Sequence, residues 1–307
     1  MPKRDPDQVF RGSFQEPPYF EDLTERCALK LTSLMRFTGR PHFTLWMDQI
    51  GGPRFREETG QYIPIFYLEL EVLDVPVETR APATVEVEVR LGRERVEEGA
   101  VPRLVSEGRT RVVVPTADGP RHVGSTRKLT IFAHLDPSRG RVTELHPFME
   151  MGSHPRRVIE IPRLIDMLRP PSGFDGDGWT FEDSEPQVWS YQQTDPNRHI
   201  HAMEYPRMLD LFVTRERAKR GVEAGDAVLS RARIFFARPC YTGEHYVRRA
   251  KVWTPAADGG QIVCAALFKC DADGRVADED RPANVCWFEP RSREAARAEL
   301  AGFRESW

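Results

Sequence analysis

Three polar residues in the second half of the chain have types suited to chemistry at a carbonyl carbon. Asp195, Asn197 and His199 stand at alternate positions, just before a stretch whose apolar residues recur at helical spacing. A carboxylate placed there can activate water or attack the carbon itself. A helix N-terminus adds unpaired N–H groups and partial positive charge, which stabilise an oxyanion. Asn197 and His199, within one turn, can hold carboxylate and substrate in register.

A purely structural interpretation of the same residues stays open. Asp195 could simply be the N-cap of the helix, because an Asp-Pro-Asn sequence is common where a turn leads into a helix. His199 and His201 are two positions apart, so they cannot share a helical face, and a metal site built from both is not expected. We therefore expect neither a metal nor a cofactor.

Residues 189–205 resemble the segment in which hot-dog thioesterases, including acyl carrier protein thioesterases, pass from the first strand to the central helix. That pattern reads Asp, any residue, Asn, any residue, His, an aliphatic residue, two Asn, two further residues and Tyr. The residues that match it are Asp195, Asn197, His199, Ile200 and Tyr205. His201 and Ala202 replace the two asparagines of the family.

The resemblance implies roles for these residues. Asp195 would be the general base or nucleophile, and Asn197 and His199 would orient it. The residues expected at the substrate are His201, Tyr205 and Trp189, with Tyr205 packing beneath the site. The substrate would be an ester of acyl carrier protein or coenzyme A. Related double hot-dog proteins include dehydratases and acyltransferases, so the reaction type stays open.

The first half of the chain contains no counterpart of the Asp-x-Asn-x-His sequence. Together with the missing asparagine pair, this favours an alternative in which the protein is not an enzyme. It would then be a hot-dog binding protein that holds a peptide or a carrier-bound intermediate, for example in natural-product biosynthesis. An exposed sheet edge can bind an extended peptide through backbone hydrogen bonds.

The elements that must position these residues follow from hydrophobic patterning. A short strand is predicted at 188–193 and a helix at 199–219, with Pro206 inside it. Further strands are predicted at 227–237, 244–253, 261–269 and 284–288. A charged helix at 292–303 is predicted to close the chain.

The first half repeats this order. A helix is predicted at 21–37, ending before Gly39 and Pro41. The strands predicted after it lie at 62–73, 84–90, 110–115 and 125–135. Segment 84–90 alternates strictly, so its glutamates should face water. The runs around Pro76 and Pro239 also match in position, each just beyond the first long strand of its half.

These patterns predict an α+β fold: a tandem, or double, hot dog in which two antiparallel sheets each wrap around a long helix. The expected parts are an N-terminal arm at 1–20, a first hot-dog half at 21–150, a linker at 151–185 and a second half at 186–307. A double hot dog can mimic a hot-dog dimer within one chain, so a monomer and a homodimer are both compatible with the sequence.

Composition narrows the range of partners. The 307 residues carry a formal net charge of −3 with 30% charged residues, so nucleic acid is not an expected partner. No apolar run is long enough for a membrane span or a secretory signal, and a cytoplasmic location is expected. The 5 cysteines include no CxxC pair, which argues against a disulfide framework or a zinc knuckle. Cys264 and Cys270, six apart in a strand-like run, are expected to be small buried apolar groups, and the alternative is that one of them lines a ligand pocket.

Overall fold

The structure is a computed structural model. The ranges that it describes are 7–24, 27–46, 61–78, 81–95, 103–116, 118–134, 155–176, 180–195, 199–221, 227–255 and 260–292. The chain forms two compact units. Unit 1 comprises Met1–Leu29, Ser33–Leu68 and Pro76–Ile161, and unit 2 comprises Lys30–Thr32, Glu69–Val75 and Pro162–Trp307.

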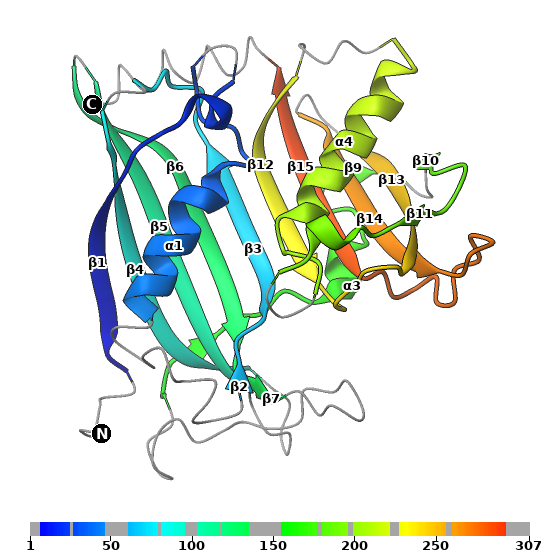
Figure 1. The fold of residues 1–307 in the computed structure, drawn as a ribbon, viewed down its shortest axis with the longest axis horizontal. Helices are drawn as coiled ribbons and strands as arrows, with labels where there is room; N and C mark the ends of the chain where they lie inside the picture. The colour runs from blue at the N-terminus through cyan, green and yellow to red at the C-terminus, as the bar shows by residue number, and fades with distance from the viewer. Residues whose placement is uncertain are drawn as a thin grey trace. The chain divides into compact units, whose positions relative to one another are not determined.

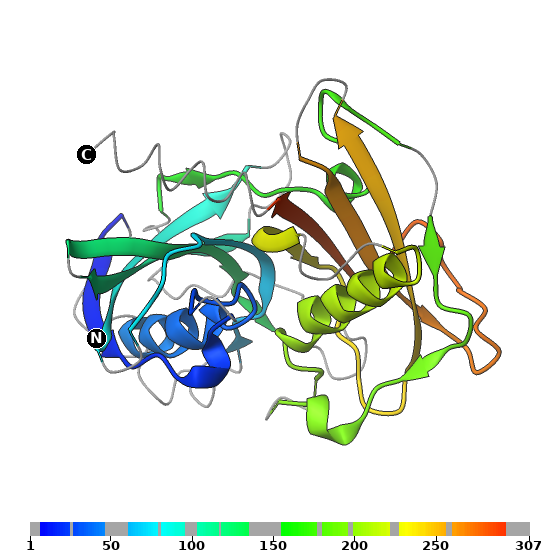
Figure 2. The same cartoon turned by 90° about the horizontal axis from the view of Figure 1, so that it is seen from above.

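Unit 1 is an antiparallel sheet that packs against one helix, α1 (Leu34–Trp46) (Figure 1). The sheet order is β1 (Val9–Glu16), β4 (Ala83–Glu94), β5 (Leu104–Thr116), β6 (Gly119–Ile131) and the first part of β3 (Ile65–Val72), which belongs to unit 1 as far as Leu68. Figure 2 shows this sheet curving over α1. On β4 the side chains alternate as predicted, because Val85 and Val87 are buried beneath the helix and Glu86 is exposed on the other face.

Helix α1 begins at Leu34, close to residue 37, where the predicted helix was expected to end. The prediction of a helix at 21–37 that stops before Gly39 and Pro41 is wrong, because α1 contains both residues. Its buried face continues through them, from Leu34 and Phe37 to Leu45, at helical spacing. Burial of this face outweighs the hydrogen bond that the proline cannot donate.

Unit 2 has the same plan, with α4 (Glu204–Ala218) packed on β13, β14 and β15. Its antiparallel sheet has the order β12 (Ala227–Phe236), β15 (Asn284–Ser292), β14 (Ile262–Cys270), β13 (His245–Pro255) and β10 (Phe181–Glu182). Short strands β9 (Phe174–Asp175) and β11 (Gln187–Val188) also pair with β13. The helix starts later than the predicted residue 199. Its length of 15 residues, and the 13 of α1, are ordinary for a globular protein.

Two segments outside the predicted hot-dog halves also form secondary structure. Residues 9–16, within the predicted arm, form β1 and pair with β4 along the length of β1. The predicted linker contributes β8 (Val158–Ile159), which pairs in parallel with β4, and a short helix, α3 (Leu164–Met167). A further pair joins β2 (Gln61–Tyr62) to β7 (Ala133–His134). The predicted helix at 292–303 lies almost entirely outside the described residues.

A buried ion pair fastens α4 to its sheet. Arg248 on β13 is 3% exposed, and its Nε lies 2.8 Å from Oδ2 of Asp183. The same guanidinium donates a hydrogen bond of 3.3 Å to the carbonyl of Met208 on α4 and lies over the ring of Phe212. These contacts satisfy a charge that burial would otherwise penalise heavily.

Candidate functional site

Asp195 and His199 lie opposite each other at the closed base of a short turn. The N–H of Asp195 donates a 2.8 Å hydrogen bond to the carbonyl of His199. An antiparallel bridge between Thr194 and Ile200 continues the pairing outward. Backbone pairing thus fixes where the carboxylate and the imidazole begin. Asn197 lies outside the described residues.

The turn does not lead directly into the helix, so the interpretation of Asp195 as the N-cap is wrong, as is its expected position at the helix start. The catalytic role of Asp195 stays a prediction. The N-cap of α4 is Met203, well after the turn. His201 occupies the helix start, because its Nδ1 accepts the N–H of Met203 at 3.3 Å and its carbonyl accepts the N–H of Glu204 at 2.9 Å. Pro206 has no N–H to offer. The helix start therefore keeps few spare donors for an oxyanion.

The return arm of the turn packs on the loop between β12 and β13. Ile200 donates its N–H to the carbonyl of Cys240 at 2.9 Å. The ring of His199 meets the half-exposed ring of Tyr241 edge to face, with centroids 5.2 Å apart. Lys269 lies over the same Tyr241 ring. The imidazole is therefore placed by an aromatic contact as well as by the backbone.

Trp189 and Tyr205 pack against each other beside the loop that carries Cys240. Trp189 is 1% exposed and stacks on Tyr246, with ring centroids 4.4 Å apart, while Tyr205 meets it edge to face. The hydroxyl of Tyr205 accepts the N–H of Cys240 at 2.9 Å. Burial raises the pKa of Tyr205, so its phenol stays protonated. Tyr205 is thus linked to the turn through Cys240, whose carbonyl accepts the N–H of Ile200. A contact of either ring with substrate stays a prediction.

The same turn occurs in unit 1, where the sequence shows no related motif. The N–H of Thr24 donates a 2.8 Å hydrogen bond to the carbonyl of Ala28, and Leu23 bridges Leu29 at the same separation along the chain as Thr194 and Ile200. The hydroxyl of Thr24 also accepts the N–H of Ala28 at 3.3 Å. Thr24 therefore occupies the position of Asp195, and Ala28 that of His199.

The residues around the two turns correspond as well. A single 3-10 turn precedes each, η1 (Phe20–Asp22) in unit 1 and η3 (Tyr191–Gln193) in unit 2. The side chain of Asp22 accepts the N–H of Tyr19, and that of Gln193 accepts the N–H of Ser190. The return arm in unit 1 pairs with Pro76, which agrees with the matched positions of Pro76 and Pro239. The chain thus repeats this substructure with different side chains.

Asp210 is a second carboxylate of interest, and it is not among the site residues predicted from the sequence. It lies on α4, where burial raises its pKa to about 6 despite a hydrogen bond with Thr214. A carboxyl group that titrates near neutral pH is a common feature of functional sites, although burial alone can produce one. The only feature of the sequence that could have pointed to Asp210 was the presence of an acidic residue beside the apolar face of the predicted helix.

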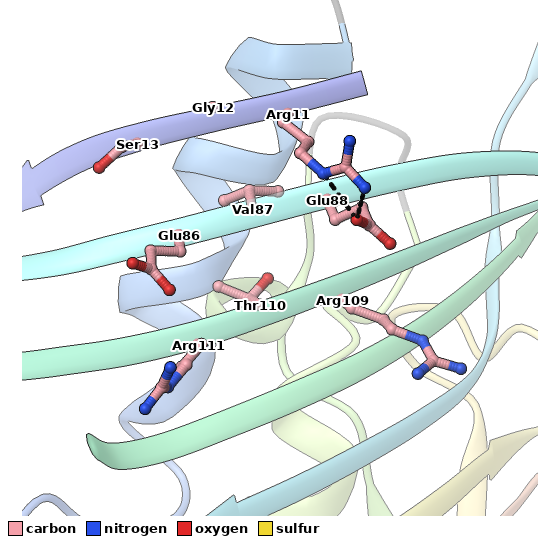
Figure 3. A pocket seen from close by; sticks show the side chains of 9 residues that line it. All are labelled: Arg11, Gly12, Ser13, Glu86, Val87, Glu88, Arg109, Thr110 and Arg111. Atoms are coloured by element: carbon pink, nitrogen blue, oxygen red, sulfur yellow. Dashed lines mark hydrogen bonds and ion pairs between the residues drawn. The ribbon is translucent and has the colours of Figure 1, made fainter. Parts of the chain in front are cut away.

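A separate depression lies on the outer face of unit 1. It has a volume of about 580 Å³ and is lined by residues of β1, β4 and β5 (Figure 3). Arg11 pairs there with Glu88, its Nε 2.9 Å from the carboxylate, and Arg109 and Arg111 stand beside them. This is the open, charged strand face that the alternation of segment 84–90 predicted.

Within the described ranges, no group of three histidine, cysteine, aspartate or glutamate side chains is placed to hold a metal ion. No helix in these ranges combines the length and apolar character needed to cross a membrane.

Cys240 lies beside the turn. Burial raises the pKa of its thiol to about 11, so Cys240 is a poor nucleophile at neutral pH.

Comparison with solved structures shows which fold this is. A proposed oleoyl thioesterase from Lactobacillus plantarum superimposes with a TM-score of 0.61 over 93% of this chain and 96% of its own, at 13% identity. A 12:0-acyl carrier protein thioesterase from Umbellularia californica gives 0.60 over 93% and 94%, at 12% identity. The chain has the fold of the acyl carrier protein thioesterases.

An acyl carrier protein thioesterase from Bacteroides thetaiotaomicron extends the likeness, with a TM-score of 0.54 over 92% of this chain and 98% of its own, at 14% identity. The similarity lies in the structure, because no protein-family model matches the sequence and no curated protein matches it. The thioesterase fold expected from residues 189–205 is thereby confirmed, and it spans both halves of the chain.

Proposed function

We propose that this protein hydrolyses acyl thioesters carried by acyl carrier protein or coenzyme A. In this proposal Asp195 is the general base or nucleophile, and Asn197 and His199 orient it and the substrate. The thioesterase fold supports the proposal, as does the motif in residues 195–205. Fold alone does not determine chemistry, so the proposal depends on the residues of the turn.

The observation that carries the proposal is the difference between the two equivalent turns. Unit 1 closes the turn with Thr24 and Ala28 through the same 2.8 Å backbone bond. The turn therefore requires neither a carboxylate nor an imidazole in order to form. Unit 2 has both, as Asp195 and His199, and their presence favours a chemical role over a role in building the turn.

The proposed reaction uses these groups as follows. The Asp195 carboxylate removes a proton from water while the water oxygen bonds to the thioester carbon. The oxyanion collapses, the C–S bond breaks, and the leaving sulfur receives the proton from Asp195. Because the donors at the start of α4 are largely occupied, the side-chain amide of Asn197 is the group we propose as a donor to the oxyanion.

A thiol-release assay tests the proposal. Purified protein is mixed with acyl-coenzyme A and acyl-carrier-protein esters, and the free thiol is measured. Asp195→Ala should abolish release, because no other described carboxylate lies in this turn, while circular dichroism shows an intact fold. Undiminished turnover in the variant would remove the assignment of Asp195.

The occupied start of α4 favours a second candidate, a non-catalytic binding protein. His201 stands where the family has asparagine, and it bonds the backbone of Met203. Such a protein would hold a peptide or a carrier-bound biosynthetic intermediate without chemistry. Calorimetry against acyl thioesters and peptides, run beside the thiol assay, separates the two, since tight binding without turnover would select the second.

A further inference from the structure

A row of polar residues lies beneath α1, where the core of unit 1 would normally be apolar. Three neighbouring cross-strand pairs of β5 and β6 make up this polar row: Ser106 with Thr130, Gly108 with Lys128, and Thr110 with Thr126. Because paired residues share a face, and positions two apart on a strand do too, all six project on the same side of the sheet. The serine and the three threonines are buried.

His42 on α1 identifies this side as the one that faces the helix. A methyl group at Gly108 would lie only 2.0 Å from Cε1 of His42, so the imidazole rests directly against the glycine backbone. His42 is 5% exposed. The glycine thus makes room for an imidazole in the middle of the polar row, next to Lys128.

Three polar atoms of this cluster are buried without a partner. They are Nδ1 of His42, Oγ of Ser106 and Oγ1 of Thr130, none of which has a hydrogen-bond partner among the described residues. Buried polar groups are nearly always hydrogen-bonded, to protein, to ordered water or to a bound ligand. Two hydroxyls and an imidazole left in this way, side by side, indicate that another molecule completes the cluster.

Lys128 indicates the charge of that molecule. It makes no ion pair within the described part of the chain, and burial lowers its pKa to about 7. The opposite face of the same strand pair differs, since Arg127 and Arg109 there both bond the carboxylate of Glu107. The sheet therefore neutralises its outer cations with an acidic side chain and leaves the inner cation without one.

We propose that the polar row binds the carboxylate of a small organic acid, with Lys128 supplying the charge and Ser106, Thr130 and His42 the hydrogen bonds. One cation matches one negative charge, and a phosphate dianion would bring a second charge into a buried place with nothing to balance it. Lys128 is partly exposed, so the row is not sealed from solvent. The site is independent of the turn at Asp195 and of the proposed hydrolysis.

Binding is tested with acetate, hexanoate and the neutral isostere acetamide, added to the full chain at constant ionic strength with sodium chloride as reference. The melting temperature and the chemical shifts of the carboxylate probe are followed. We expect both acids to bind and acetamide and chloride to have no effect. Tighter binding of hexanoate than of acetate would identify a fatty acid as the ligand. Equal binding of the two would identify a short-chain acid.

Variants then place the binding at the polar row. Lys128→Met should weaken acetate binding at least tenfold, because it removes a charge-assisted hydrogen bond. Ser106→Ala should weaken it severalfold while leaving the fold intact, since it deletes an atom that has no partner. Arg109→Gln, on the outer face, is the matched control and should bind as the wild type does. Absence of binding by either acid, or unchanged affinity in Lys128→Met, would overturn the proposal.

Discussion

The backbone N–H of Asp195 and the carbonyl oxygen of His199 are joined by a hydrogen bond of 2.8 Å, and this bond closes the turn on which the proposed chemistry depends. Thr24 and Ala28 make the same bond in the other half of the chain. One backbone substructure thus appears twice, once with side chains that can move a proton and once without. The side chains of the unit 1 turn can therefore be used as substitutions in the unit 2 turn.

The buried pair of Arg248 and Asp183 should contribute strongly to stability. Arg248→Met removes the buried guanidinium that balances the charge of Asp183. It leaves this carboxylate with the backbone N–H of residue 248 and the more exposed Arg215, 3.2 Å away, so we expect a loss of about 3 kcal/mol in the free energy of unfolding. Urea denaturation measures this loss. The control is Arg163→Met, which breaks an exposed pair with Asp166 and should produce no measurable change. Equal losses in both variants would contradict the account of the pair.

Tyr205 should stabilise the loop that supports the turn. Tyr205→Phe keeps the ring but leaves the buried N–H of Cys240 without its acceptor, which should cost about 1–3 kcal/mol. Thermal unfolding followed by circular dichroism measures the effect. Tyr191 is 80% exposed, so Tyr191→Phe should leave the melting temperature unchanged. A Tyr205→Phe protein as stable as the wild type would show that the hydroxyl does not fasten the loop.

Asp210 should make stability depend on pH. Its pKa is about 6 in the folded chain against an ordinary 3.8, so the folded state holds the proton to higher pH than the unfolded state does. The wild type therefore loses stability as pH rises from about 4 through 6, by about 3 kcal/mol. Asp210→Asn should remove this loss. The free energy of unfolding of the variant should therefore match that of the wild type near pH 4 and exceed it by the full amount at pH 7. An advantage that does not vary with pH would exclude burial of the charge as its cause.

His201 should affect stability more than substrate binding. Its Nδ1 accepts the N–H of Met203 at the start of α4, so His201→Ala should lower the free energy of unfolding by about 1 kcal/mol, as the loss of a helix cap does. Chemical denaturation and steady-state kinetics are measured together on the same preparation. Unchanged stability with a raised KM would instead return His201 to the substrate-binding role implied by the family resemblance.

The strands were predictable because their alternation is determined by burial. Segment 84–90 shows this, since each valine faces the helix and each glutamate faces away. The helix α1 was misplaced because Gly39 and Pro41 are normally stop signals, and only its packing on the sheet shows that the buried face continues past them. Tertiary contacts decided that question, and a single sequence does not contain them.

The segment that carries the candidate site was predictable from the sequence, but the position of Asp195 relative to the helix was not. The residue types in 195–205 identified the fold and the segment, but they placed Asp195 at the helix start, where His201 and Met203 in fact lie. The second copy of the turn could not be found in the sequence, because Thr24 and Ala28 share no chemistry with Asp195 and His199. What the two turns share is a backbone hydrogen-bond pattern, which different residues can form.

The most direct test of the central claim replaces the residues of one turn with those of the other. A chain carrying Asp195→Thr and His199→Ala has in unit 2 the side chains that already form this turn in unit 1. We predict a melting temperature within about 2 °C of the wild type. Thiol release from acyl thioesters should fall at least about 100-fold, because the general base is lost. Turnover at the wild-type rate by this folded double variant would contradict the account.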